Sequence, residues 1–235
     1  MVLAERKKIK AIKSVPLRER VYAELRHALM TGAFHPGESV TIKSLSDQLE
    51  VGVTPVRDGV QRLAAGGALV ITPNREVRVP YLTRSEFEDI YEIRLNLEGV
   101  AASKAANNMT PEALGHLEAI FTQLGRLSST ADAETILSYN IDFHFGVYAE
   151  ARSKQLLSFI EELWLRIGPL MILPIAATAE GRQAYIKQFL GKGGLHRALL
   201  DRLALNDGDG ARAAIWAIIG NAADWYREHY EFARE

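Results

Sequence analysis

The stretch TIKSLSDQLEVGVTPVRDGVQRLAAGGALVITPNREVRV, residues 41–79, decides the fold of this chain. Its first part has the apolar spacing of a short amphipathic helix over residues 42–50. A tight turn follows, and a second helix is expected with Thr54 as its N-cap and Pro55 as its first helical residue. Two short helices joined by a tight turn predict a helix-turn-helix, whose second helix enters the major groove of DNA.

The segment after the second helix predicts a β-hairpin. A Gly66-Gly67 pair ends the helix, and two apolar strands are expected over residues 69–71 and 77–79. They are joined by a turn over residues 72–76, which contains Pro and Asn. A hairpin in this place is the wing of a winged helix-turn-helix.

The second helix of the motif is expected to have one buried and one open face. The side chains predicted to face the core follow a spacing of four and three residues and are Val56, Val60 and Leu63. The side chains left on the open face are Thr54, Arg57, Asp58 and Gln61. With a further helix expected over residues 17–31, this assigns residues 1–80 to a DNA-binding domain.

The charge distribution favours a nucleic-acid partner for this domain alone. Residues 1–80 hold 13 Lys and Arg against 8 Asp and Glu, whereas residues 81–235 hold 15 against 21. A basic N-terminal part joined to an acidic C-terminal part suits a protein that presents only one end to the phosphates of a nucleic acid. Chance asymmetry in a two-domain protein is the alternative explanation.

Composition excludes several classes of protein. The chain has 235 residues and no cysteine, which excludes disulfides and thiol catalysis and is typical of a reducing compartment. The N-terminal sequence MVLAERKKIKAIK carries charges where a signal peptide has an apolar core. The most apolar stretch, residues 167–179, is shorter than the roughly 20 residues that span a bilayer. A soluble, cytoplasmic protein without a membrane partner is predicted.

Residues 81–235 lack strand signals and predict an all-α domain. Helical periodicity defines six stretches, at residues 83–107, 111–127, 132–150, 153–173, 179–206 and 209–233. The predicted fold is therefore mainly α, with an N-terminal winged helix-turn-helix and a C-terminal six-helix bundle.

Several motifs of the chain resemble those of a known family. The motifs Pro16-Leu17-Arg18, Gly32-x-x-x-Pro36-Gly37, Leu45-Ser46-x-x-Leu49 and Thr54-Pro55-Val56-Arg57-Asp58 resemble a GntR-type winged helix. The motifs Arg94-x-x-Leu97-Glu98, Phe143-His144 and His196 are similar to the FCD effector domain of the FadR subfamily. The resemblance implies a ligand-responsive transcription factor, most often a repressor, that binds a pseudo-palindromic operator in double-stranded DNA as a homodimer.

The same resemblance indicates DNA contacts. Lys43, Thr54 and Arg57 match family positions that approach phosphates and bases. Arg57 is the candidate for base recognition, since a guanidinium bonds bidentately to guanine. Lys43 and Arg75 are candidates for phosphate contacts, which fix register without reading sequence. Gln61 and Asn74 complete the expected DNA-binding set. For each cation the alternative is a solvated surface charge.

Two departures from the family pattern affect this surface. Many relatives have Ser-Arg before the Thr-Pro pair, whereas this chain has Gly52-Val53. At the wing tip Glu76 stands where a glycine is usual, which adds a negative charge near the phosphates. The preferred operator is therefore expected to differ from the common family consensus.

The resemblance also implies a polar site in the bundle. Asn140 and His144, four residues apart, share a helix face, and His196 matches a later histidine of the FCD metal site. The fourth ligand position falls on Ile218, which cannot coordinate a metal. A divalent cation, Zn²⁺ or Ni²⁺, at Asn140, His144 and His196 is one hypothesis. In the other, these side chains contact an organic effector directly.

Arg94 matches a position that the family usually fills with arginine. Pointing inward, it would grip the carboxylate of a small organic acid with two bonds. The alternative is an ion pair with Glu98, one turn away, on the helix surface. The three tryptophans, Trp164, Trp216 and Trp225, are spaced as core or dimer-surface residues.

Two other functions are alternatives to an effector-controlled regulator. One is a degenerate metal-dependent enzyme in the bundle, which the absence of any recognisable catalytic motif disfavours. The other is an architectural winged-helix dimer without an effector. The sequence predicts a regulator and no enzymatic activity.

Overall fold

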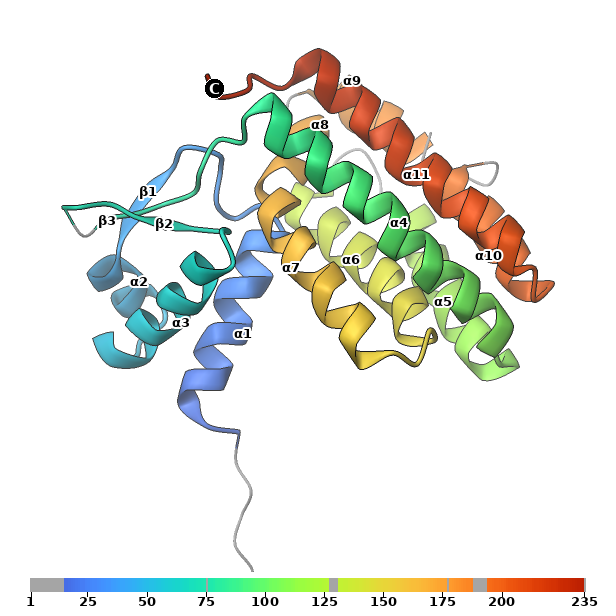
Figure 1. The fold of residues 1–235 in the computed structure, drawn as a ribbon, viewed down its shortest axis with the longest axis horizontal. Coiled ribbons are helices and arrows are strands. Elements are labelled where there is room, and N and C mark those ends of the chain that lie inside the picture. The colour runs from blue at the N-terminus through green and yellow to red at the C-terminus, as the bar shows by residue number, and fades with distance from the viewer. Residues whose placement is uncertain (1–14, 75, 127–130, 177, 188–193, 235) are drawn as a thin grey trace, which may run out of the picture.

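Helix α1 (Leu17–Met30) lies between the two parts of the molecule, with the small sheet on one side and the helical bundle on the other (Figure 1). The computed structural model describes residues 15–74, 76–126, 131–176, 178–187 and 194–234. None of the helices described in these ranges is long and apolar enough to cross a membrane.

The N-terminal part is a winged helix-turn-helix, as predicted. Its elements after α1 are β1 (Ser39–Thr41), α2 (Ile42–Gln48), α3 (Val53–Ala65), β2 (Val70–Ile71) and β3 (Glu76–Arg78). The strands form an antiparallel sheet in the order β1-β3-β2, with Val40 opposite Val77 on one side and Ile71 opposite Val77 on the other. The hairpin β2-β3 is the predicted wing. Strand β1 was not predicted, because its three residues gain their partner only from β3, far along the chain.

The boundaries of the two short helices differ from the prediction. Helix α3 begins at Val53 with Gly52 as its N-cap, so the assignment of Thr54 as the N-cap is wrong. Pro55 is tolerated in the first turn because the N–H groups there have no intrahelical acceptor. Helix α2 ends at Gln48, two residues early, since Glu50 adopts a left-handed φ of 52° that no helix accommodates.

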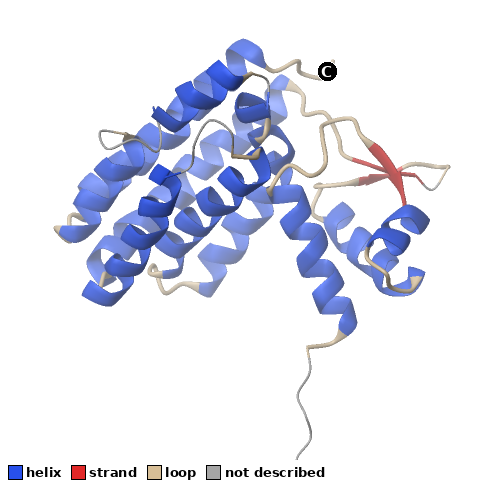
Figure 2. Cartoon of the chain, turned by 180° about the vertical axis from the view of Figure 1, so that it is seen from behind, coloured by secondary structure: helices blue, strands red, loops and turns tan. Residues whose placement is uncertain are grey.

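The C-terminal part is all-helical, and Figure 2 shows its packed helices from behind. Its elements are α4 (Arg84–Asn108), α5 (Pro111–Arg126), α6 (Ala133–Ala149), α7 (Lys154–Met171), α8 (Leu173–Ala176), α9 (Ala179–Tyr185), α10 (Leu195–Ala204) and α11 (Gly208–His229). The long helices α4 and α11 pack side by side (Figure 1). The predicted all-α domain is confirmed, although the number of helices exceeds six.

Two of the six predicted helices are divided or shortened. The single helix expected over residues 179–206 is wrong, because α10 starts anew after Gly194, whose backbone is extended. The last helix ends at His229 instead of residue 233. The chain beyond it turns back, and the Ala233 N–H donates to the Leu82 carbonyl over 2.9 Å. This contact ties the C-terminus to the link between the two parts.

Helix α4 starts at a capping box that fixes where the bundle begins. The Thr83 hydroxyl accepts from the Glu86 N–H over 3.2 Å, and the Glu86 carboxylate accepts from the Thr83 N–H over 2.9 Å. Two N–H groups that the helix leaves without a partner are satisfied in this way.

Replacing Thr83 with Ala is expected to destabilise the protein by about 1 kcal/mol, because a helix cap is lost. Thr122→Ala is the matched control, since the Thr122 hydroxyl only bonds back to the Glu118 carbonyl within α5 and its loss should be nearly neutral. Urea unfolding of both variants measures the difference. Equal stability of the two would contradict this role of the cap.

Candidate nucleic-acid interface and buried chamber

Helix α3 is held by its apolar face against α1. Val56, Val60 and Leu63 are almost fully buried. Gly59 allows the close approach, because a Cβ there would lie 3.0 Å from the Leu25 Cδ1 atom of α1. The predicted buried face is confirmed, and the opposite face of α3 is left in solvent.

The exposed face of α3 carries the expected polar side chains, Thr54, Arg57, Asp58 and Gln61. Within the described part of the chain, Arg57 forms no ion pair. By contrast, the Arg62 guanidinium lies 3.1 Å from Glu19 and 3.6 Å from the centre of the Tyr22 ring. Arg57 can therefore reach a base edge without breaking an ion pair to any of the described residues.

The other expected DNA-binding residues lie around this helix. Lys43, on α2, is exposed and forms an ion pair with Asp47 one turn later. Asn74 is exposed at the tip of the wing, whereas Arg75 lies outside the described residues. Arg78, which sequence reasoning missed, is exposed on β3 and donates to the Ser39 hydroxyl over 3.1 Å. Its place follows from the pairing of β1 with β3.

The structure brings the predicted effector residues together inside the bundle. Arg94, Asn140, His144 and His196 are all buried. They line one cavity of about 40 Å³, together with Ile218, the expected fourth ligand position. We call this cavity the inner chamber. Asp142 and His229 do not line it.

Arg94 and Glu98 form a buried ion pair in this region. The Arg94 Nε atom lies 2.6 Å from the Glu98 carboxylate, and the two side chains are 5% and 0% exposed. The alternative of a surface ion pair is therefore wrong, although the partner was named correctly. Arg94 also lies over the rings of Tyr91 and Trp164, at 4.8 and 5.3 Å from their centres.

A chain of hydrogen bonds runs from this ion pair to the two histidines. The Tyr148 hydroxyl donates to Glu98, so its oxygen accepts from the Nδ1 atom of His144 at 3.0 Å. The Nε2 atom of His144 then carries the lone pair and faces His196 Nε2 at 3.1 Å. Sequence reasoning missed Glu98 as an inward partner and Tyr148 altogether.

The protonation states follow from burial. Burial lowers the pKa of His144 well below its usual value, and nearby His196 and Arg94 lower it further. Burial also raises the pKa of Tyr148, and the Glu98 carboxylate adds to that rise. His144 is therefore neutral at physiological pH, with one lone pair open to a donor or a cation.

The donors of the inner chamber fit a divalent cation with three protein ligands. Two imidazole nitrogens bound to one Zn²⁺ at about 2.0–2.1 Å in tetrahedral geometry would lie roughly 3.3 Å apart, close to the 3.1 Å observed. The Asn140 Oδ1 atom is buried without a hydrogen-bond partner in the described structure. Tyr148 orients His144 from behind, as a partner of a metal-binding histidine does. The third ligand would be an amide oxygen, because the described residues include no group of three or more His, Cys, Asp or Glu side chains placed to hold a metal ion.

A second cavity of about 280 Å³ adjoins the inner chamber and shares Tyr185, Ala222 and Tyr226 with it. We call it the outer cavity. Trp225 lines it, and Trp164 lines the inner chamber, so two tryptophans border cavities in addition to packing in the bundle. Trp216 is 45% exposed on the outside of α11.

A winged helix with an open recognition helix, joined to an all-α domain around a buried polar chamber, defines a DNA-binding transcriptional regulator with a sensor domain. The chain belongs to the GntR family of bacterial regulatory proteins. Residues 17–79 match the model of that family and residues 89–221 match the FCD domain. It is a regulator and not an enzyme.

Individual relatives agree with this family. The HTH-type transcriptional regulator McbR of Escherichia coli K12 is 34% identical over 67% of this chain and 72% of its own length. The solved structure of E. coli McbR/YncC has a TM-score of 0.82 at 29% identity and covers 93% of this chain and 100% of that one. The E. coli transcriptional repressor GlaR is 25% identical over 61% of this chain and 67% of its own length.

Acid is expected to destabilise the protein through His144, measured with EDTA present to keep the site free of metal. The unfolded chain takes up a proton near pH 6.5, whereas native His144 does not. This contribution to stability is therefore constant above that pH and falls below it, by at most about 1.4 kcal/mol per pH unit. Urea unfolding between pH 7.5 and 5.5 should show a shallower pH dependence for His144→Gln. Parallel curves for the variant and the wild type would refute the assignment.

Restoring the missing donor is expected to strengthen metal binding. Ile218→His adds an imidazole to Asn140, His144 and His196, so this variant should retain Zn²⁺ or Ni²⁺ through dialysis better than the wild type. His196→Ala should abolish retention in both backgrounds. Elemental analysis of the dialysed proteins makes the comparison. If Ile218→His retained no more metal than the wild type, these side chains would not converge on one ion.

Proposed function

We propose that this regulator binds a pseudo-palindromic operator as a homodimer and represses transcription until a small organic acid releases it. The observation that carries the DNA-binding part is the open polar face of α3, where Arg57 is exposed and has no ion pair with any residue that the structure describes. We place the division between the domains at residues 80 and 81, and the protein in the cytoplasm with its DNA. The name of GlaR supports repression as the sign of regulation.

The proposed contacts to DNA fall into two classes. Arg57 reads bases in the major groove, with Thr54 and Gln61 beside it on the same face. Lys43, Asn74 and Arg75 hold the phosphate backbone. Lys43 must leave Asp47 to do so. Since that ion pair is exposed, the exchange costs little.

The proposed effector site is the inner chamber. Arg94 is the anchor for an anionic group, and Asn140, His144 and His196 bind either the effector or a divalent cation beside it. The charges of Arg94 and Glu98 cancel, and His144 is neutral. A carboxylate entering alone would therefore bring an uncompensated charge into a buried site, which is costly. A cation at the three donors would balance it, and this favours a metal-assisted site.

Pairing of two chains has a candidate surface on the outside of the bundle. Ile93 and Val100, seven residues apart on α4, are 47% and 39% exposed, and Trp216 of α11 is exposed as well. The Trp216 Nε1–H donates to the Leu95 carbonyl of α4 over 2.7 Å, which ties this ring to the same helix. We propose that a second copy of the chain covers these apolar side chains, since a two-fold operator requires two recognition helices in fixed relation.

An architectural dimer without an effector is the remaining alternative. Thermal unfolding in the presence of small organic acids separates the two, because a ligand at a hundredfold excess over its Kd stabilises the folded state by about 2.7 kcal/mol. An architectural protein would show no such stabilisation by any acid.

Arg57→Ala is expected to weaken binding to promoter DNA from upstream of the gene itself by about 1–3 kcal/mol, roughly 5- to 150-fold in Kd. Arg126→Ala, which removes the same charge from the exposed end of α5, is the control and should bind like the wild type. Fluorescence anisotropy at low salt measures both, and its stoichiometry should give two chains per fragment. Equal affinities for the two variants, or no binding by the wild type, would overturn the proposed function.

A further inference from the structure

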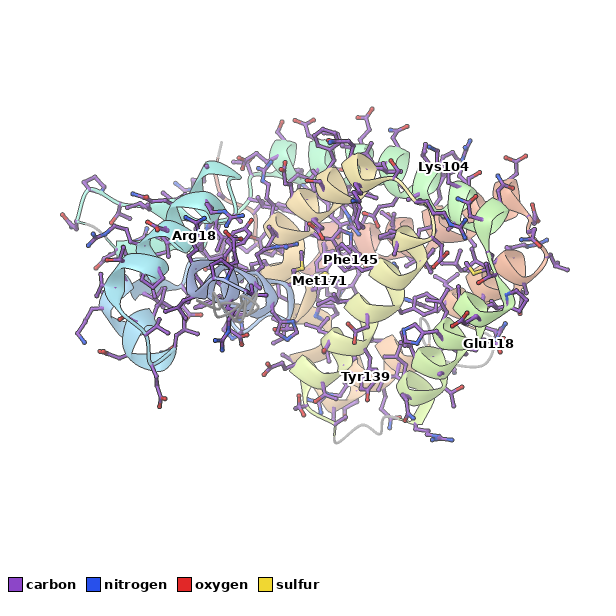
Figure 3. All side chains as sticks on the ribbon, turned by 90° about the horizontal axis from the view of Figure 1, so that it is seen from below. Arg18, Lys104, Glu118, Tyr139, Phe145 and Met171 are labelled. Atoms are coloured by element: carbon purple, nitrogen blue, oxygen red, sulfur yellow. The ribbon has the colours of Figure 1, made fainter. Side chains whose placement is uncertain are left out.

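The inner chamber is too small for an organic effector as it stands. Its volume of about 40 Å³ holds roughly two or three water molecules. An organic acid that binds within the inner chamber, and not in the adjoining outer cavity, must therefore displace part of the wall. Helix α7 supplies three of the wall residues, Trp164, Ile167 and Met171, and Met171 is labelled in Figure 3.

The same helix touches the DNA-binding domain at Gly168. A Cβ on Gly168 would lie 2.6 Å from the Leu29 carbonyl oxygen and 2.7 Å from the Met30 Cα atom, so the backbones of α7 and α1 are in direct contact. Close packing of this kind transmits displacement, because no flexible side chain lies between the two helices to absorb it. Pro169 follows within α7 and removes one hydrogen bond of the helix, which makes bending easier there.

Arg166 of α7 reaches the end of the recognition helix. Its Nε atom would lie 3.6 Å from a Cβ on Gly67, in the turn that follows α3. Its guanidinium also lies 3.7 Å from the Glu86 carboxylate at the start of α4. A cation beside the C-terminal end of a helix is favoured by the helix dipole. Arg166 thus connects α7 to the C-terminal end of α3.

The residues of α7 that face the chamber and those that face α1 form neighbouring stripes. Trp164, Ile167 and Met171 make the first stripe. Glu161, which pairs with Arg26 of α1 over 3.0 Å, and Gly168 lie on the second. At 100° per residue the two stripes are roughly 80° apart around the helix axis. A shift of α7 away from the chamber must therefore also move its contact with α1.

We propose that α7 couples the inner chamber to the DNA-binding domain, with Gly168 and Arg166 as the positioning residues. This inference rests on the proposed function. Displacement of Trp164 and Met171 by a ligand moves α7, and the contacts at Gly168 and Arg166 carry α1 and α3 with it. Coupling between two sites is reciprocal, so DNA bound to α3 must also change the surroundings of Trp164.

The test uses this reciprocity and needs no effector. Trp216→Phe with Trp225→Phe leaves Trp164 as the sole tryptophan of the full-length chain. Trp164 is packed between the rings of His144 and Phe145, at 5.1 and 5.2 Å, so its fluorescence reports the state of the chamber. Promoter DNA is titrated while anisotropy of the labelled DNA follows binding and tryptophan emission follows the chamber.

We expect DNA binding to shift the emission of Trp164, and we expect Arg166→Ala and Gly168→Ala each to bind DNA with that shift reduced, because each variant removes one of the two contacts. Lys154→Ala, at the exposed far end of α7, is the control and should keep the shift. Arg166→Ala leaves the close backbone contact intact, so the test stands even if Gly168→Ala misfolds.

Each outcome of this titration either supports or overturns the coupling between the inner chamber and the DNA-binding domain. DNA binding without a change at Trp164, or a shift that is undiminished in Arg166→Ala, would overturn the coupling while leaving the proposed function intact. Failure of the wild-type protein, with Trp216 and Trp225 in place, to bind the DNA at all would remove the proposed function, and the coupling with it.

Discussion

The packing of α3 on α1 is the interaction on which the rest of the structure depends. Val56, Val60 and Leu63 bury one side of α3, and this leaves Arg57 and Gln61 in solvent. A rotation of α3 by about half a turn would put the guanidinium of Arg57 into an apolar core, at a cost of several kcal/mol for an unpaired charge. The same helix α1 packs on its other side against α7. The orientation of the recognition helix is thus set from within the protein.

The bundle contains a second constraint, the buried pair of Arg94 and Glu98. Two charges in a low-dielectric interior are tolerated only with further hydrogen bonds, and Tyr148 supplies one of them to Glu98. Removing one partner of such a pair typically costs about 3–5 kcal/mol. The pair therefore fixes the direction of Tyr148 and, through it, the tautomer of His144. The result is a stable inner chamber into which the lone pair of His144 Nε2 points.

Much of the fold could be predicted from local sequence signals. The period of apolar residues located α4, α5 and α6 within one or two residues, and the pattern of α3 separated its buried face from its open face correctly. Features that depend on distant partners could not be found in this way. Strand β1 exists because β3 pairs with it, and the C-terminal tail leaves the helical path to bond with Leu82.

The candidate site shows the same limit. Asn140, His144 and His196 were recognisable from the resemblance to the FCD domain, and spacing added only that the first two share one helix face. The direction of the Arg94 side chain could not be predicted, because spacing alone does not tell whether a pair four residues apart faces solvent or core. The bond from Tyr148 to Glu98 joins residues 50 positions apart. No local pattern signals such a contact.

The most direct test of the central claim measures the accessibility of α3 with and without DNA. The chain has no cysteine, so Gln61→Cys and, as a control on α5, Glu118→Cys each provide a single alkylation site. We predict that both react rapidly in the free protein and that promoter DNA protects the cysteine at position 61 alone. Unchanged alkylation at position 61 while DNA is bound would contradict the assignment of α3 as the recognition helix.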